Sequence, residues 1–261
     1  MSQFWSEFFR ITEDWNGEYF GIAHIIVSSL VTVAFIGLGV FFGLRLRGAD
    51  EKRRMRPIRI ATIIFLAVQL TYYIVNIVRD GWADLVSSLP LFLCDIQLFS
   101  LPLAAWGKGR LQKIGFDFSI VLGLLAALMG AWFNAAVFSN NPIWSYDVIW
   151  NYVNHCVPGF ISIYIVFGRF TKLHFKDMLV TFAVMLLFEG VALLVDFTLD
   201  ENYMFFRSSS GTPFSIFETI AAGNQVVYVI LVILGMHAYV AVYYLIYFIV
   251  EKVREAKAKK A

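Results

Sequence analysis

The chain has 261 residues, of which 59% are hydrophobic and 15% charged, and its mean hydropathy is +0.71. A soluble domain of this size carries more charge, so the composition excludes an ordinary soluble globular protein and predicts a membrane protein. The formal net charge is only +2. Membrane topology and attraction to anionic lipid account for the basic excess, so no nucleic-acid partner is predicted.

The first twenty residues are expected to form an outer amphipathic segment rather than a cleavable signal. They mix acidic residues such as Glu7 and Glu13 with aromatic residues such as Trp5 and Phe8. They also lack a basic stretch followed by an apolar one, which a signal peptide requires. A stretch of this kind lies in the membrane interface. We therefore expect residues 1–20 to lie on the outer membrane surface.

Seven apolar runs follow. Most of them are long enough to cross a hydrocarbon core about 30 Å thick, which takes roughly 20 helical residues. The fifth is short and has His155 near its start. The connections are also short, so we expect one compact helical domain over residues 21–250, followed by a basic tail over 251–261. The runs cover residues 21–44, 58–78, 86–106, 115–137, 153–170, 178–199 and 226–249.

Lysine and arginine fall almost wholly on one side of the membrane that these runs imply. Groups of basic residues follow the first, third, fifth and seventh runs, whereas the opposite side holds only Arg10, Arg79 and Arg207. Cytoplasmic loops carry an excess of Lys and Arg, so the N-terminus is predicted outside and the C-terminus in the cytoplasm. The sequence therefore predicts an all-α, multi-pass membrane protein with seven transmembrane helices.

The polar residues inside the apolar runs are the candidates for function. An ionisable group at mid-bilayer costs roughly 2.5–3.5 kcal/mol, so each one calls for a partner or a wet cavity. Most of these residues fall in the outer half of the predicted membrane, while Glu189 and His237 lie near its middle. This distribution predicts a polar pocket open toward the outer leaflet. Its candidate lining residues are His24, Gln69, Asn76, Gln97, Asn134, Asn154, Asp196 and Asn202.

A purely structural interpretation of the same residues stands beside this one. Groups near helix ends are inexpensive because they reach the headgroups or cap a helix, which suits His24, Asn76, Asp196 and Asn202 equally well. A lone cysteine such as Cys94 is more often a small buried apolar residue. Asp95 and His155 are different, since Asp95 lies several residues inside an apolar run. For these two residues a shared polar site is the favoured interpretation.

The segment Leu89–Asp95 resembles the Leu-Pro-Leu-His-Leu-Cys signature of YwaF-type bacterial integral membrane proteins. Two further segments match that family: Asn154–His155 at the start of the fifth run, and Asn202–Phe205 with the Arg and Pro that follow it. The resemblance covers essentially the whole chain in the number of spans and the order of motifs. Phe92 is a departure, because the family usually has His there. The resemblance implies a multi-pass protein of the bacterial plasma membrane.

That family is in turn distantly similar to eukaryotic seven-span acyltransferases, which move polyunsaturated acyl chains between phospholipids with a cysteine nucleophile. By this resemblance Cys94 would be the nucleophile and His155 its base, while Asp95 or Asn154 would orient the pair. A neighbouring His activates a thiol by stabilising the thiolate. The implied function is lipid acyl transfer or hydrolysis, with membrane lipids as partners and without a cofactor or metal.

The alternative function is a carrier of protons or small solutes, or a binding or sensor protein without turnover. A cavity lined by Asp95, His155, Glu189 and Asp196 would pass protons or bind a polar solute. An enzyme depends on the Cys94 thiol, whereas a proton-coupled carrier depends on the carboxylates and tolerates loss of the thiol. The segment 208–213 is either a mobile lid or a simple connector.

Overall fold

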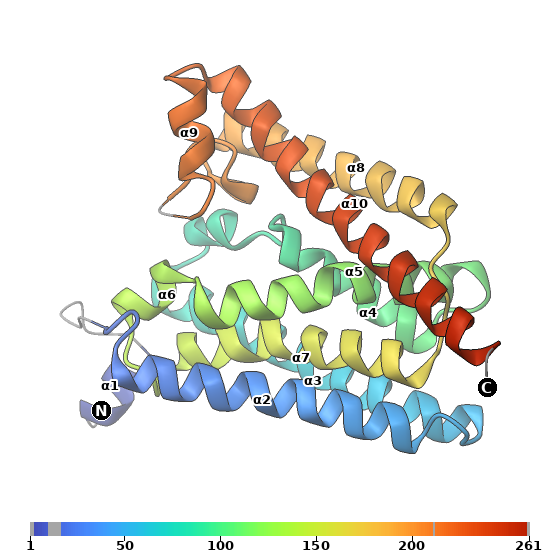
Figure 1. Ribbon diagram of the computed structural model, residues 1–261. Coiled ribbons are helices and arrows are strands. Elements are labelled where there is room, and N and C mark those ends of the chain that lie inside the picture. Colours follow the sequence, from blue (N-terminus) through green and yellow to red (C-terminus); the bar gives the residue numbers. More distant parts are fainter. Residues whose placement is uncertain (1–2, 10–16, 211, 260–261) are drawn as a thin grey trace. The chain divides into compact units, whose positions relative to one another are not determined.

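The structure is a computed structural model that describes residues 3–9, 17–210 and 212–259. Every regular element in these residues is helical (Figure 1), as the sequence predicts. The chain forms two compact units, Met1–Phe170 and Thr171–Ala261. The helices of the first unit are α1 (Gln3–Phe8), α2 (Ile22–Arg45), α3 (Glu51–Asp80), η1 (Ala83–Ser88), η2 (Leu93–Ile96), α4 (Gln97–Trp106), α5 (Arg110–Trp132), α6 (Ala135–Asn140) and α7 (Tyr146–Gly168).

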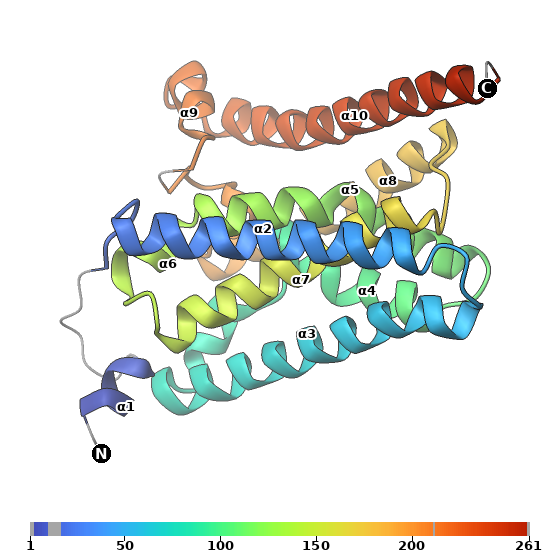
Figure 2. The ribbon, with the colours of Figure 1, turned by 60° about the horizontal axis from the view of Figure 1, so that its bottom comes forward.

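The first unit is built around α7, which packs against α2, α3 and α5 (Figures 1 and 2). Hydrogen bonds at both ends fix the direction of each neighbour. The Tyr152 hydroxyl lies 2.8 Å from that of Ser28, and the Phe167 carbonyl accepts from Arg47 at 2.7 Å, so α7 runs parallel to α2. The Tyr164 hydroxyl donates to the Arg54 carbonyl at 2.7 Å, close to the start of α3. Helix α7 is therefore antiparallel to α3.

The fifth apolar run, expected over 153–170, belongs to a 23-residue helix that begins at Tyr146. The first half of α7 carries Asp147, Asn151, Asn154 and His155, and all four are buried. Because this half of the helix faces other helices, polar side chains can be satisfied there by protein partners. Hydropathy detects contact with lipid, which explains why the sequence placed the start of this helix too late.

The third run, expected over 86–106, is a broken segment rather than one helix. It consists of the 3₁₀ helices η1 and η2 followed by α4, which has ten residues. Leu89, the residue before Pro90, has an extended backbone with φ −59° and ψ 145°, as a following proline favours. The segment nevertheless runs antiparallel along α3. Its Ser88 hydroxyl accepts from Asn76 at 3.2 Å, and its Ala105 carbonyl accepts from Arg59 at 3.1 Å.

Two other boundaries differ from the sequence-based ones. The fourth run, expected to continue to residue 137, ends as a helix at Trp132. Asn134 then caps the separate helix α6, because its side chain accepts from the Val137 N–H at 3.4 Å. At the basic end of α3, the helix begins at Glu51, where the Asp50 side chain accepts from the Arg53 N–H at 3.0 Å. This cap lets α3 continue beyond its apolar run.

The second unit contains α8 (Phe175–Leu199), η3 (Tyr203–Phe205), α9 (Ser215–Ala221) and α10 (Gln225–Ala258). Helices α8 and α10 lie side by side and antiparallel (Figure 1), since Thr181 contacts Tyr244 and Glu189 contacts His237. One stripe of α8 is buried at helical spacing. It consists of Thr181, Met185, Glu189, Ala192 and Asp196.

The connection between α8 and α10 is tied down by hydrogen bonds. The Asn202 side-chain oxygen accepts from the N–H groups of Arg207 at 2.8 Å and Ser208 at 3.1 Å. The Tyr228 hydroxyl donates to the Phe205 carbonyl at 2.8 Å. The Ser209 hydroxyl donates to Glu218 at 2.8 Å. Apart from residue 211, which lies outside the described residues, these contacts favour a simple connector over a mobile lid.

Within the described residues, five helices are long and apolar enough to cross a membrane. Many of their large apolar side chains are exposed, as on helices that face lipid; Val78 on α3 is 80% exposed and Leu187 on α8 is 66% exposed. The protein is therefore a membrane protein with multiple apolar helices. The five segments are Ile22–Arg45, Glu51–Asp80, Arg110–Asn140 (which includes α5 and α6), Phe175–Leu199 and Gln225–Lys257.

Candidate functional site

Cys94 lies in η2, at the break in the third segment, and its thiol is free. Its Sγ lies 3.9 Å from Asp95 Oδ1 and donates to that oxygen. The second cysteine, Cys156, is free as well and is buried in an apolar cluster with Phe35 and Ala127. Cys94 is thus the thiol with polar surroundings.

Asp95 has a structural role that the sequence did not reveal. Its Oδ2 accepts from the N–H of Phe92 at 3.0 Å, and Phe92 is the residue that precedes η2. The first N–H groups of a helix have no partner inside the helix, and a carboxylate three residues along satisfies one of them. The other oxygen of Asp95 accepts from Cys94. Asp95 therefore fixes the turn that carries the thiol.

His155 is held in one orientation on α7. Its Nδ1 lies 2.8 Å from the carbonyl oxygen of Asn151. A carbonyl only accepts, so Nδ1 carries the proton, and in the neutral imidazole Nε2 is the basic nitrogen. The ring packs directly on Gly130 of α5, where a Cβ atom would lie 2.0 Å from His155 Cγ. The absence of a side chain at Gly130 makes room for the imidazole.

A chain of amides supports this orientation. The Asn134 side chain donates to Asn151 Oδ1 at 2.8 Å, and the Asn151 side chain donates to the Gly130 carbonyl at 2.8 Å. The sequence singled out Asn134 but missed Asn151, because Asn151 lies before the expected start of the fifth run. Its position four residues before His155 was the available signal, since residues at that spacing share one face of a helix.

Cys94 and His155 lie on elements that pack on a common neighbour. No hydrogen bond or ion pair joins them in the part of the chain that the structure describes. Both η2 and α7 pack on α5. A Cβ atom at Gly115 would lie 2.3 Å from the Ala104 nitrogen, which shows how closely α4 runs antiparallel to the start of α5. The N-terminal extension of α4, which is η2, therefore lies further along α5, toward Gly130.

Two other predicted pocket residues of the first unit keep unsatisfied polar atoms. Gln97 is fully buried, and its oxygen accepts from Ser100 at 2.8 Å, but its Nε2 has no partner among the described residues. Asn154 is buried as well, and its Oδ1 lacks a partner there. Burying such groups unpaired costs about 1–3 kcal/mol each, so both atoms call for a partner that the described residues do not supply.

Gln69 and Asn76 instead join α3 to its neighbours. Gln69 Oε1 accepts from the indole N–H of Trp150 at 3.1 Å. Asn76 accepts from Arg79 at 2.9 Å and donates to Ser88 at 3.2 Å. The sequence missed the ion pair beside them, in which Arg79 lies 3.0 Å from Asp147 on α7; Asp147 is buried and Arg79 is largely buried. Residues far apart along the chain make this pair, so the sequence pattern carries no signal for it.

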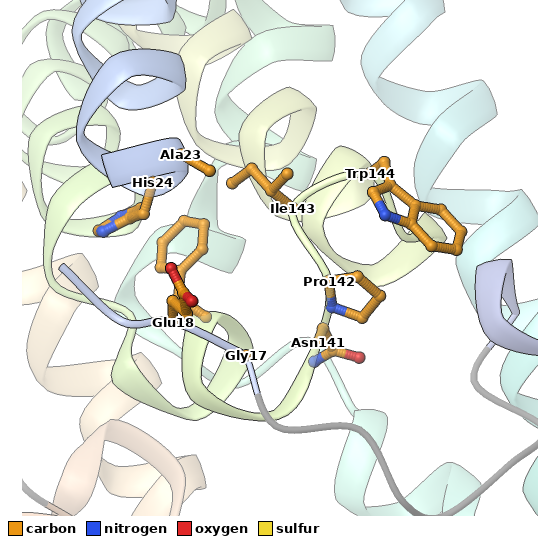
Figure 3. Close-up of a pocket in the computed structure, with 9 residues that line it drawn as sticks. Gly17, Glu18, Ala23, His24, Asn141, Pro142, Ile143 and Trp144 are labelled. Atoms are coloured by element: carbon orange, nitrogen blue, oxygen red, sulfur yellow. The ribbon is translucent and has the colours of Figure 1, made fainter. Parts of the chain in front are cut away.

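A cavity of about 180 Å³ lies near the start of α2, beside the predicted pocket residue His24 (Figure 3). The imidazole is already satisfied, since Nδ1 accepts from the Phe20 N–H at 3.1 Å and Nε2 donates to the Ala131 carbonyl at 3.2 Å. We therefore assign His24 a structural role. The cavity is lined by Gly17, Glu18, Ala23, His24, Phe138, Asn141, Pro142, Ile143 and Trp144.

Asp196 and Asn202 lie in the second unit, where they organise the connection after α8. Asp196 Oδ1 accepts from the Tyr203 N–H at 2.6 Å, while Oδ2 has no partner among the described residues. Asn202 binds the backbone of Arg207 and Ser208. Both residues are explained in large part by this local role, which is the structural interpretation that the sequence left open for them.

In the described residues there is no group of three or more His, Cys, Asp or Glu side chains that could hold a metal ion.

Comparison with known proteins places these elements in one family. No curated protein and no solved structure matched the chain. The model of the TMEM164 family matches residues 19–252, a range that begins just before α2 and ends within α10. Because this match includes both compact units almost entirely, the chain belongs to the TMEM164 family.

Proposed function

We propose that this membrane protein acts on lipid acyl groups, with Cys94 as the nucleophile and His155 as its base. The observation that carries the proposal is the fixed orientation of His155. Its Nδ1 proton is held by the Asn151 carbonyl, which leaves Nε2 basic, and the ring rests on Gly130 of the helix that also supports η2. Nucleophilic catalysis by cysteine requires a base with a defined tautomer, and the shared neighbour α5 is what links His155 to the free thiol of Cys94.

In the proposed reaction, His155 Nε2 takes the proton of Cys94, and the sulfur attacks the carbonyl carbon of a lipid ester. The ester C–O bond breaks, and the leaving oxygen receives the proton from His155, so a lysolipid departs and a thioester remains. A hydroxyl of a second lipid, or water, then attacks the thioester after giving its proton to His155. The sulfur leaves and recovers that proton, which completes acyl transfer or hydrolysis.

Gln97 is the proposed donor to the carbonyl oxygen during these steps. It follows Cys94 by three residues, a spacing that places both side chains on one side of a helical turn. Its unpaired Nε2 is an amide donor in a buried setting, where a hydrogen bond to developing negative charge is strongest. Asp95 is a positioning residue in this scheme, because it caps η2 and holds the thiol.

The membrane arrangement belongs to the same proposal. We place the N-terminus outside and the C-terminus in the cytoplasm of a bacterial plasma membrane, with seven membrane segments. Five are the apolar helices, the sixth is α7, and the seventh is the broken segment η1–η2–α4. The antiparallel course of that broken segment along α3 supports a full crossing. The resemblance to YwaF-type proteins and to cysteine acyltransferases supports the same assignment.

The test is labelling of the two thiols with a lipid-like electrophile in purified protein. We expect fast labelling of Cys94, a large loss of that rate in His155→Ala, and slow labelling of Cys156, the matched buried thiol. Gln97→Ala should leave labelling intact but slow acyl transfer from a phospholipid, since it removes only the donor to the carbonyl oxygen. Labelling of Cys94 no faster than Cys156, or unaffected by His155→Ala, would refute the enzyme.

A further inference from the structure

The second unit buries a carboxylate and an imidazole together near the middle of its two long helices. Glu189 lies on α8 and His237 on α10, and Glu189 Oε1 lies 3.5 Å from His237 Nδ1. The side chain of Glu189 is 1% exposed and that of His237 is 14% exposed. The sequence placed both residues near mid-membrane, and the structure brings them into contact.

Hydrogen bonding around this pair is incomplete. His237 Nδ1 lies 2.9 Å from the Ile233 carbonyl and donates to it. His237 Nε2 has no partner among the described residues, and neither carboxyl oxygen of Glu189 receives a hydrogen bond there. The Phe182 ring, 4.8 Å from the imidazole ring, contributes only apolar surface. Within the part of the chain that the structure describes, the carboxyl group therefore has the imidazole as its polar neighbour and no hydrogen-bond donor.

This geometry restricts the charge states that the pair can adopt. An ionised Glu189 beside a neutral His237 would leave a bare negative charge at mid-membrane, which is the expensive case. One added proton removes that charge imbalance, either as a neutral carboxyl group beside a neutral imidazole or as a carboxylate beside an imidazolium. We infer that Glu189 and His237 form a proton-binding site of the second unit, in which the pair holds one proton in common.

Several other titratable groups of this unit each have a hydrogen-bond partner, although Asp196 Oδ2 remains unpaired among the described residues. Along α8, Asp177 accepts from the His174 N–H at 2.7 Å, and Asp196 accepts from the Tyr203 N–H at 2.6 Å. On α10, the Tyr244 hydroxyl lies 3.3 Å from that of Thr181, two turns from the pair. Glu218 on α9 accepts from Ser209. Glu189 differs from these carboxyl groups because both of its oxygens are unpaired in the described part of the chain and an imidazole lies beside it, so the buried proton is assigned to Glu189 and His237.

The site goes beyond the proposed acyl chemistry, because it uses neither Cys94 nor His155 and lies in the other compact unit. A protonatable carboxylate buried at mid-membrane is the group on which proton-coupled membrane proteins rely. Proton binding at Glu189 would thus give this chain a second activity, in which the charge of the Glu189–His237 pair between α8 and α10 changes with pH. Removal of the Cys94 thiol would leave that activity intact.

Labelling with dicyclohexylcarbodiimide tests this inference, since this apolar reagent modifies protonated carboxyl groups in apolar surroundings. In the full chain in lipid nanodiscs, mass spectrometry should find Glu189 modified, with modification falling as pH rises. Glu189 should react several-fold more in His237→Gln than in the parent at the same pH, because no imidazolium then stabilises the carboxylate. Asp196→Asn is the matched control and should leave Glu189 modification unchanged.

Three results would overturn the inference. Glu189 could stay unmodified at every pH while a water-soluble carbodiimide modifies exposed carboxylates such as Glu255, which would show that Glu189 holds no proton. Its modification could be the same in the parent and in His237→Gln, so that the two residues share nothing. Sodium or lithium ions could protect Glu189 at constant pH, which would assign the site to a metal cation instead.

Discussion

Replacement of Gly130 by alanine tests the placement of His155 directly. A Cβ atom at Gly130 would lie 2.0 Å from His155 Cγ, whereas ordinary contacts begin at 3.4 Å. The imidazole would therefore have to move by about 1.4 Å, the difference between these distances. Such a movement breaks the 2.8 Å hydrogen bond between Nδ1 and the Asn151 carbonyl. The substitution removes the orientation of the proposed base without changing the base itself.

The magnitude follows from three contributions. Overpacking a buried site costs about 1–3 kcal/mol. Loss of the Nδ1 hydrogen bond adds about 1 kcal/mol, and the better helix propensity of alanine returns about 1 kcal/mol. We therefore expect Gly130→Ala to lower the free energy of unfolding by about 1–3 kcal/mol. Gly37→Ala on α2 is the matched control, because a Cβ atom there meets nothing within 4 Å and should stabilise the protein slightly.

The assay is equilibrium unfolding of both variants in one detergent, together with Gly130→Ala/His155→Ala. Removing the imidazole removes the clash, so Gly130→Ala should no longer destabilise the protein when His155 is alanine. Interaction energies of about 0.5–3 kcal/mol are typical of residues in contact. Equal stability of Gly130→Ala and Gly37→Ala, or additive effects in the double variant, would refute the placement of His155 on Gly130.

Two further predictions concern stability. Asp147→Asn should lower the free energy of unfolding by about 3–5 kcal/mol, because it leaves the largely buried Arg79 without its main partner. Asp80 is the second, more exposed partner of Arg79, so Asp80→Asn should cost less than about 1 kcal/mol. Equal losses in the two variants would contradict this ranking. Ala222→Gly should be neutral or stabilise by up to about 1 kcal/mol, since Ala222 has φ +47° at the end of α9. Ala256→Gly, inside helical α10, should instead destabilise by about 1 kcal/mol. If thermal unfolding shows the same loss for both glycine variants, backbone strain at Ala222 is not relieved.

Hydropathy predicted the lipid-facing helices well and the central helix poorly, for one physical reason. Helix α2 exposes many large apolar side chains, as a helix that faces lipid does, so its apolar run of 21–44 nearly coincides with Ile22–Arg45. Helix α7 is surrounded by α2, α3 and α5. Its first two turns therefore carry Asp147 and Asn151 at no cost in contact with lipid, and the sequence pattern missed them.

The break in the third segment was only partly predictable. Pro90 indicates a kink or a helix start, and the structure has a non-helical turn there. The role of Asp95 as a cap for the Phe92 N–H depends on the chain turning at that point. An acidic residue inside an apolar run predicts a polar site equally well. The sequence therefore identified an unusual residue and could not separate a cap from a ligand.

For the candidate sites, the sequence predicts how deep a residue lies in the membrane but not which way its side chain points. Topology gives the height of each residue in the membrane, which is why Glu189 and His237 were both predicted near the middle. It does not give the rotation of a helix about its axis or the choice of its neighbours. The pairs Arg79–Asp147 and Glu189–His237 depend on both of these, so they emerge from packing alone.

Buried polar groups that have protein hydrogen-bond partners stabilise the fold, whereas those with unpaired atoms are the candidates for binding a ligand or a proton. Arg79, Gln69 and Asn151 have protein partners and account for the polarity of α3 and α7. Gln97 in the first unit and Glu189 in the second keep unpaired polar atoms at a cost of about 1–3 kcal/mol each, which a ligand or a proton would offset. Cys94 and Glu189 lie in different compact units and have no partner in common among the described residues, so Cys94→Ala should leave carbodiimide modification of Glu189 unchanged. Glu189→Gln should likewise leave Cys94 labelling unchanged. A change in either cross-measurement would show that the two sites act as one.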